Sequence, residues 1–204
     1  MIKYLIILIA LSQIAAAQLL PGGERERYEG GDRKLSSGMA YADFAMKGAN
    51  MLDEWGVEAG LGFGVHITRK FTLGIGVYQL FSQNIRIHID ETAASPLLWL
   101  TYGGAELGYR TPVMGGFEIG AEALIAMGYS NISLSPDVGA FVDANNDWYF
   151  LAEPSLLAGW RFTDLSFLQI SLGWRIAAGV DYKNVLDDSD LSGAVAGIKL
   201  ITSF

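Results

Sequence analysis

Apolar and other residues alternate strictly between Trp55 and Ile67. The apolar positions are Trp55, Val57, Ala59, Leu61, Phe63, Val65 and Ile67, and the positions between them are Gly56, Glu58, Gly60, Gly62, Gly64 and His66. Successive side chains of a β-strand point to opposite faces, so this pattern predicts a strand with one wholly apolar face. Glycines would weaken a strand whose other face met water, whereas the narrow lumen of a barrel needs small residues. The segment therefore favours a membrane barrel whose apolar face contacts lipid.

The same period of two predicts seven further strands. The eight expected strands cover residues 38–46, 55–67, 71–78, 97–110, 117–129, 148–161, 168–176 and 193–204. The third strand is expected to continue through Ile85, Ile87 and Ile89 as an extension beyond the bilayer. Pro154 falls on the outward face of the sixth strand, where it predicts either a lost ladder hydrogen bond or a bulge.

The connections between these strands alternate in length. Short turns are expected at residues 68–70, 111–116 and 163–165, longer loops at 90–96, 131–147 and 181–191, and a connection of intermediate length after the first strand. Outer-membrane barrels combine tight periplasmic turns with longer external loops. Aromatic girdles are expected at both lipid interfaces: Trp55, Trp99 and Trp148 near the outer ends, and Phe71, Tyr109, Phe117, Trp160 and Phe204 near the inner ends. We predict an all-β, eight-stranded, antiparallel up-and-down transmembrane β-barrel with both termini in the periplasm.

Composition fits a protein exported from the cytoplasm. Residues 1–17 combine Lys3, an apolar stretch and a site of small residues, which predicts a cleaved signal peptide. Residues 18–36 are expected to form a flexible periplasmic arm and residues 37–204 the barrel. The chain has no Cys, which excludes a disulfide framework and a thiolate metal site. Its net charge of -8 argues against a nucleic-acid partner.

The signal peptide, the eight alternating segments and the terminal Phe204 together resemble the small eight-stranded outer-membrane proteins of Gram-negative bacteria, of the OmpX, OmpW and OmpA-barrel type. The resemblance covers about residues 37–204 and implies an outer-membrane location, in contact with lipid and lipopolysaccharide. It implies that Phe204 is the signal for the barrel-assembly machinery, although Thr202 stands where such signals often carry an aromatic residue. Residues 186–193 also look like the last hairpin of small barrels with no assigned activity to transfer.

Ionisable residues on the predicted inward faces form the candidate site. They are Glu58, Glu106, Glu118, Glu122, Glu153, Arg110, Arg161, Arg175, Lys199 and His66. Charges in a closed lumen must be paired or hydrated, because stranding one costs several kcal/mol. We interpret the set as a salt-bridged network that fills the lumen, since eight strands leave room for little beyond side chains. The alternative is a narrow polar pore, because the inward glycines leave volume for water.

Enzymatic chemistry would require a different set of residues. Ser82, His88 and Asp90 are the residue types of an enzyme that modifies lipid at the outer leaflet. Their spacing matches no catalytic motif, and a triad is defined by geometry rather than by the presence of its members. We therefore predict a protein without catalytic residues, metal or cofactor.

The predicted external loops are acidic. They carry Asp53, Asp90, Glu91, Asp137, Asp143, Asp147, Asp181, Asp187, Asp188 and Asp190 against Lys47, Arg86 and Lys183. Within them Asp143, Asn145 and Asp147 have the spacing of the start of a calcium loop. The Gly and Glu that complete that motif are absent, so we expect a turn with at most a weak cation site. The acidic surface suits divalent cations that bridge lipopolysaccharide, or a basic partner.

These observations favour a non-enzymatic outer-membrane protein that contributes to envelope integrity or to surface interactions. The open alternatives are a small pore, a lipid-modifying enzyme, and a soluble periplasmic barrel with its apolar faces turned inward.

Overall fold

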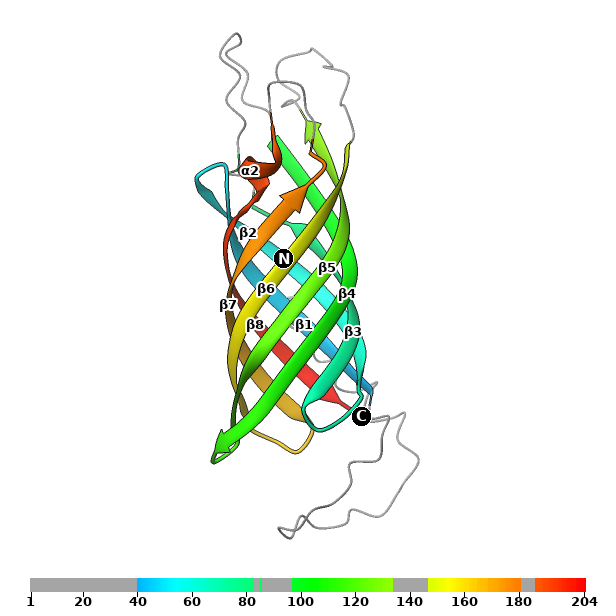
Figure 1. Ribbon diagram of the computed structural model, residues 1–204, viewed down its shortest axis with the longest axis vertical. Helices are drawn as coiled ribbons and strands as arrows, with labels where there is room; N and C mark the ends of the chain where they lie inside the picture. The colour runs from blue at the N-terminus through cyan, green and yellow to red at the C-terminus, as the bar shows by residue number, and fades with distance from the viewer. Residues whose placement is uncertain (1–39, 83–84, 86–96, 134–146, 181–185) are drawn as a thin grey trace, which may run out of the picture.

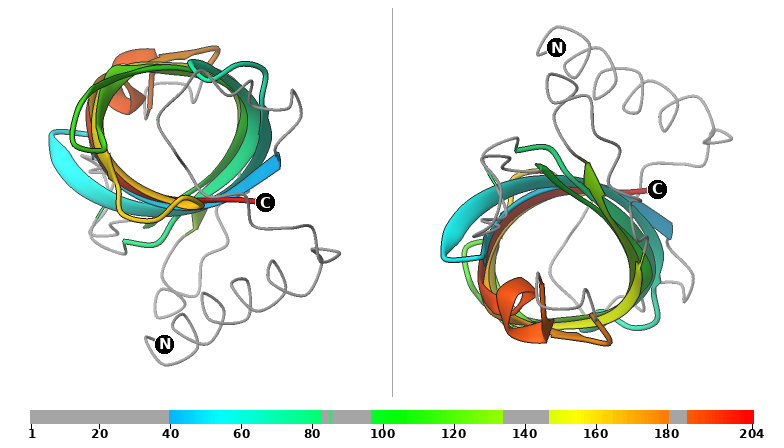
Figure 2. Two further views of the ribbon diagram at one scale, coloured as in Figure 1. Left: turned by 90° about the horizontal axis from the view of Figure 1, so that it is seen from below. Right: turned by 90° about the horizontal axis from the view of Figure 1, so that it is seen from above.

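Eight strands close into a barrel. The computed structural model describes residues 40–82, 85, 97–133, 147–180 and 186–204. The strands are β1 (Ala40–Met51), β2 (Glu54–His66), β3 (Phe71–Leu80), β4 (Leu97–Met114), β5 (Phe117–Ser133), β6 (Asp147–Arg161), β7 (Ser166–Ala178) and β8 (Gly193–Ser203). Each pairs antiparallel with the next, and β8 pairs with β1, so that the strands form a ring (Figures 1 and 2). The predicted barrel is confirmed; the signal peptide and arm predicted for residues 1–36 lie outside the described residues.

The two ends of the barrel differ (Figure 1). The turn end holds the short connections at residues 67–70, 115–116 and 162–165, and the opposite, loop end holds the connections that leave β3, β5 and β7. One helical turn, α2 (Asp188–Leu191), precedes β8 at the loop end. The β1–β2 connection there is only Leu52 and Asp53, with φ of 52° and 61°. The predicted intermediate length is wrong, because β1 continues to Met51.

The strand β4 ends later than predicted. The expected turn over residues 111–116 shrinks to Gly115 and Gly116, whose φ of 59° and 84° suit glycine. The pairing with β5 continues through Pro112 and Met114, with a register shift between them. An irregularity of this kind accommodates a proline, which has no N–H for the ladder.

The predicted straight extension of β3 is not present. β3 ends at Leu80, and the backbone N–H groups of Phe81 and Ser82 both donate to the Val57 carbonyl, at 2.8 and 3.3 Å. Ile85 is not in a strand, and its side chain is buried in the apolar cluster at the mouth of the barrel instead of projecting outward. Ile87 and Ile89 lie outside the described residues.

Large apolar side chains cover the outside of the barrel. Trp55, Trp99 and Trp148 are exposed towards the loop end, and Phe71, Phe117 and Trp160 towards the turn end. A surface this apolar is typical of a barrel that faces lipid, and a soluble barrel with its apolar faces inward is wrong for this chain. In the described part of the chain, no helix is both long and apolar enough to cross a membrane.

Pro154 interrupts one ladder of the barrel. The β6–β7 pairing is recorded for Ala152 with Ile176 and for Ser155 with Gly173, but not between them. The register is the same on both sides of the gap, so the structure shows the lost pairing that the proline predicts and no bulge. On its other side Pro154 stays paired with Ala123 of β5.

Candidate functional site

The lumen is apolar at the loop end. Side chains from the strands meet Ile85, Val180 and two residues around α2, Leu186 and Leu191, in a single buried cluster. The strands contribute Ala45, Ala49, Met51, Leu80, Leu98, Leu100, Leu124, Ala126, Leu151, Ala177 and Val195, and the rings of Tyr78, Tyr102 and Tyr149 belong to the same cluster where it borders the charged layer. This apolar layer was not predicted. The inward positions carry charged residues at mid-strand but leucines near the loop end, and near the loop end both faces of a strand are apolar, so alternation is lost there.

Two hydrogen bonds to the barrel, together with an internal cap, hold the segment around α2 over this layer. The Leu52 N–H donates to the Asp190 carbonyl at 2.8 Å, and the Val180 N–H donates to Asp188 Oδ1 at 2.7 Å. Asp187 caps the helical turn by accepting from the Ser189 hydroxyl and from the N–H groups of Ser189 and Asp190. These hydrogen bonds hold the pKa of Asp187 below its usual value. Leu191, which is 1% exposed, is thereby kept inside the barrel mouth.

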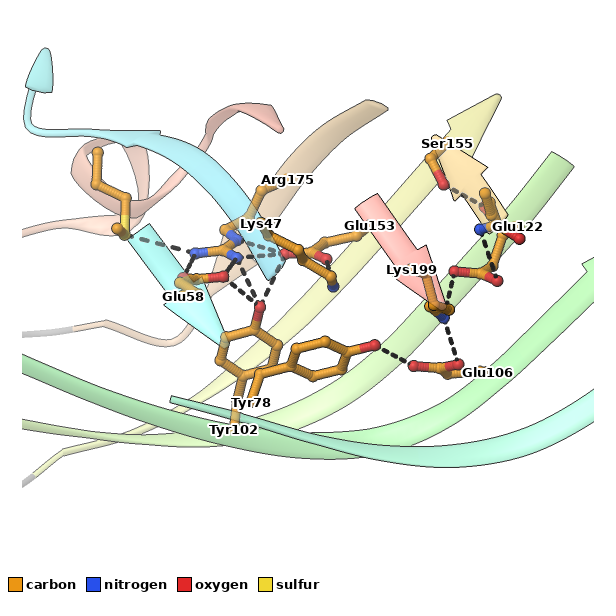
Figure 3. A network of polar contacts seen from close by, with 12 residues as sticks. Lys47, Glu58, Tyr78, Tyr102, Glu106, Glu122, Glu153, Ser155, Arg175 and Lys199 are labelled. Carbon is orange, nitrogen blue, oxygen red and sulfur yellow. Dashed lines mark hydrogen bonds and ion pairs between the residues drawn. The ribbon is translucent and has the colours of Figure 1, made fainter. Parts of the chain in front are cut away.

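Arg175 is the centre of the charged layer below (Figure 3). Its Nη1 and Nη2 donate to the two carboxylate oxygens of Glu58, each at 2.7 Å, and its Nε donates to Glu153 Oε1 at 2.6 Å. Nη2 also donates to the Tyr102 hydroxyl at 2.8 Å, and that hydroxyl donates to Glu58 Oε2 at 2.6 Å. The side chains of Arg175 and Glu58 are 1% and 0% exposed, so the pair is dry and fully bonded.

Two lysines extend this network along the lumen (Figure 3). Lys47 donates to Glu153 Oε2 at 2.6 Å, and its ammonium lies 3.7 Å from the centroid of the Tyr78 ring. Lys199 donates to Glu106 at 2.8 Å and to Glu122 at 2.9 Å. The Tyr78 hydroxyl donates to Glu106, and its ring stacks on Tyr102 with centroids 5.1 Å apart. The two tyrosines therefore join the lysine pairs to the Arg175 cluster.

Side chains fill the space above the inward glycines. A Cβ at Gly60 would overlap the Tyr78 ring, and one at Gly64 or Gly74 would overlap Tyr41. The expectation that these glycines leave volume for water is wrong: they leave room for large side chains that reach across from neighbouring strands.

The turn end of the lumen is only partly closed by charge pairs. Arg161 donates to Glu118 from Nε at 3.1 Å and from Nη2 at 2.8 Å, and it is about one-third exposed. His66 Nε2 lies 3.1 Å from the Ser203 hydroxyl. Arg110 is buried, with its guanidinium carbon 4.9 Å from the Phe167 ring centroid. This end is therefore polar and aromatic rather than apolar.

One lumen carboxylate has no partner in the described part of the chain. Six carboxylates face the lumen with five lysine and arginine side chains. The carboxylates are Asp43, Glu58, Glu106, Glu118, Glu122 and Glu153, and the cations are Lys47, Arg110, Arg161, Arg175 and Lys199. Both oxygens of Asp43, which is 5% exposed, lack a hydrogen-bond donor, and the Nε of Arg110 lacks an acceptor.

All ten residues proposed from the sequence lie in the lumen, but they form separate groups. Glu58, Glu106, Glu122, Glu153, Arg175 and Lys199 join the central network, Glu118 pairs with Arg161, and His66 and Arg110 stand apart. Lys47 was assigned to the acidic loops and is instead 9% exposed inside the barrel. Its even spacing from Asp43 on β1 was a signal for this position. Tyr78 and Tyr102 carried no signal beyond their inward parity.

The other candidates cannot be assembled into sites. The Ser82 hydroxyl accepts a hydrogen bond from the Val57 N–H at 3.0 Å, whereas His88 and Asp90 lie outside the described residues. Asp143 and Asn145 also lie outside them, and Asp147 is placed only as the first residue of β6. Among the described residues, no group of three or more metal-ligating side chains is poised to hold an ion.

Comparison with known proteins shows a shared fold. No protein-family model and no curated protein sequence matches the chain. The structure of Neisserial surface protein A superposes with a TM-score of 0.54 at 10% identity, covering 83% of this chain and 98% of that one. The N-terminal barrel of Pseudomonas aeruginosa OprF gives 0.50 at 13% identity, covering 82% and 99%. A major outer membrane protein from Thermus thermophilus gives 0.50 at 11% identity, covering 80% and 99%. The chain therefore has the fold of the small eight-stranded transmembrane barrels of outer membranes.

Proposed function

We propose that the protein is a non-enzymatic outer-membrane barrel that is closed to ions and presents an acidic loop end at the cell surface. The observation that carries this proposal is the filling of the lumen by two stacked layers, one apolar and one salt-bridged. A passing ion would have to cross the apolar layer around Leu100 and Leu191, where the described side chains are apolar and cannot replace its water. It would then meet the Arg175 cluster, whose donors are already taken.

The loop end supplies the surface for interactions. Among its described residues, Asp53, Glu54, Asp187, Asp188 and Asp190 are acidic, and none is basic. Phosphate groups of lipopolysaccharide would be bound there through divalent cations, and basic partners directly. Neisserial surface protein A, which shares the fold, is by its name a surface protein. In this proposal the signal peptide directs export and Phe204 directs assembly of the barrel.

Single-channel recording tests whether the lumen is closed. We expect the refolded mature protein to show the heat-modifiable gel mobility of a folded barrel and no conductance in a planar bilayer. The matched variant L100S/L191S places hydroxyls in the apolar layer and should remain silent unless R175A is added, which opens the charged layer too. Discrete conductance steps from the unmodified protein would overturn the proposal and make it a pore.

Envelope function is tested in cells. Loss of the protein should raise sensitivity to detergent and to chelators, and the unmodified gene should restore resistance. We expect D53N/E54Q to restore resistance less well, because it removes exposed charge at the loop end. The control D164N removes one charge from the exposed β6–β7 turn at the opposite end. Full rescue by D53N/E54Q would reject a role for these two charges.

A further inference from the structure

A groove lies on the outer, lipid-facing side of the barrel wall. It has a volume of about 860 Å³ and is almost wholly apolar. Its base includes Ala121, Ala123 and Pro154, and its walls include Tyr109, Leu156 and Trp174. Glu122 of the charged lumen layer is among its lining residues, but the outward side chains on either side of it lie outside the lumen, and the closed-barrel function leaves the groove without a role.

The groove arises from a local lack of side-chain volume. Ala121 is paired with Tyr109 on one side and with Leu156 on the other, and Ala123 is paired with Pro154. Short side chains therefore sit side by side on β5 and β6, between large ones on β4 and β7. At Pro154 the ladder to β7 is also interrupted, so the base of the groove lies where the pairing of the barrel strands is interrupted.

The groove runs from the membrane surface towards its middle. One end is formed by Ile67, Thr68 and Phe71, in and beside the β2–β3 turn at the turn end. The other is formed by Leu172 and Trp174, in the middle of β7 (Ser166–Ala178). An elongated apolar molecule in this groove would therefore enter from the leaflet at the turn end.

The mouth of the groove is positively charged. Arg69 and Lys70 follow Thr68 directly, and they are the exposed cationic side chains of the described residues. The chain as a whole has a net charge of -8, and the other two turns at this end contain Gly115 and Gly116, or Asp164. Thr68 Oγ1 accepts from the N–H groups of Lys70 and Phe71, which fixes the shape of the turn.

We propose that an anionic phospholipid of the turn-end leaflet binds here, with its phosphate at Arg69 and Lys70 and one acyl chain along the groove. The charge at the mouth selects an anionic headgroup, and the narrow hollow suits a flexible chain better than the convex wall of a second barrel. This inference rests on the membrane placement in the proposed function but not on closure of the lumen, so conductance and lipid binding are independent tests.

Native mass spectrometry of the purified protein tests the binding. The protein in detergent is titrated with phosphatidylglycerol or with phosphatidylcholine carrying the same acyl chains. We expect one tightly bound phosphatidylglycerol, with apparent affinity lowered about fivefold for each charge removed in R69A/K70A. A123F should weaken the binding of both lipids by filling the groove. D164N, at the same end, and A59F, on the outer face of β2 where its ladder partners Met46 and Gln79 do not line the groove, should change neither.

Gel mobility verifies that each variant is folded, and A121L replaces A123F if that variant does not fold. Equal binding of the two lipids, unchanged by R69A/K70A and A123F, would mean unselective annular lipid and would overturn the proposal. A dimer that A123F disrupts, without bound lipid, would assign the groove to a second copy and would overturn it too.

Discussion

Arg175 illustrates how a charge is kept inside this barrel. All three of its guanidinium nitrogens donate to lumen partners, and the bidentate pair with Glu58 matches the geometry of the two planar groups. A buried ion pair of this kind gains little over an apolar pair of the same shape, but breaking it by removing one partner is costly. The network therefore fixes which side chains occupy the lumen.

Truncating Arg175 should expose this cost. We expect R175A to lower the free energy of unfolding by about 3–5 kcal/mol, since Glu58 and Glu153 would lose their shared cation. The measurement is urea unfolding in detergent micelles, followed by tryptophan fluorescence. R161A is the matched control, because Arg161 is one-third exposed and has Glu118 as its recorded partner; its loss should be near 1 kcal/mol. Equal losses would show that burial does not set the cost.

Parity along the strands was enough to place the ten candidate residues in the lumen, because alternation depends only on local backbone geometry, but Lys47 and the apolar layer were missed. Strand parity was not enough to predict which of these residues form ion pairs with each other. Glu58 and Arg175 are far apart in sequence and meet only after β2 and β7 have taken their places across the closed ring. Asp43 shows the same limit, since nothing in its neighbouring residues indicates that it would be left without a donor.

At the scale of elements, the β1–β2 turn is strained for a reason. Leu52 and Asp53 both have positive φ, a region that costs a residue other than glycine about 1–2 kcal/mol. Leu52 packs against the apolar layer, and its N–H donates to Asp190. The packing of Leu52 and its hydrogen bond to Asp190 therefore offset the backbone strain at this residue.

Asp53 makes no such contact with the part of the chain that the structure describes, so replacing it should relieve strain. We expect D53G to raise the free energy of unfolding by about 1 kcal/mol. L52G should give no gain, because relief at the backbone is offset by the lost packing of Leu52 against the apolar layer. Urea unfolding of the two variants distinguishes these results, and a gain from L52G as large as that from D53G would contradict the packing argument.

The cap of α2 makes the loop end sensitive to acid. The folded-state pKa of Asp187 lies below its unfolded value, so its contribution is present above the ordinary aspartate pKa and is lost as pH falls through the folded value. We expect amide exchange in residues 188–192 to rise at strongly acidic pH more than exchange in β5. D187N should make exchange at this segment less dependent on pH in that range. An unchanged acid response in D187N would assign it to other carboxylates.

Regular elements were predictable to different degrees. Four of the seven connections, those after β2, β5, β6 and β7, fell close to the predicted places, because a loss of alternation marks a strand end whatever the tertiary context. The β3 extension failed because Ile85 is buried in the mouth, a contact with the apolar layer that local sequence does not contain. The predicted end of β4 was too early, because Pro112 and the two glycines together have the composition of a single turn. In the structure the register shift keeps Pro112 in the ladder.

At the scale of the molecule, closure of the ring brings the two ends of the barrel sequence together. The Phe204 N–H donates to the Ala40 carbonyl at 2.9 Å, and the Phe204 side chain remains partly exposed at the turn end. We expect F204A to reduce the fraction of protein assembled in the membranes of cells while changing the stability of the refolded barrel by about 1 kcal/mol or less. F71A, another exposed aromatic at this end, is the control and should assemble normally. Equal assembly of F204A and F71A would reject a signalling role for Phe204.

The apolar layer has a further consequence before the barrel exists. Near the loop end the strands are apolar on both faces: Leu98 and Leu100 point inward while Trp99 points outward. In an exported, unfolded chain this segment is a continuous apolar run, which is the kind of sequence that self-associates in water. A chain that crossed an aqueous compartment unfolded would therefore be most prone to self-association at this run. The residues that pack the mouth of the finished barrel are thus those that would most need shielding from water before it forms.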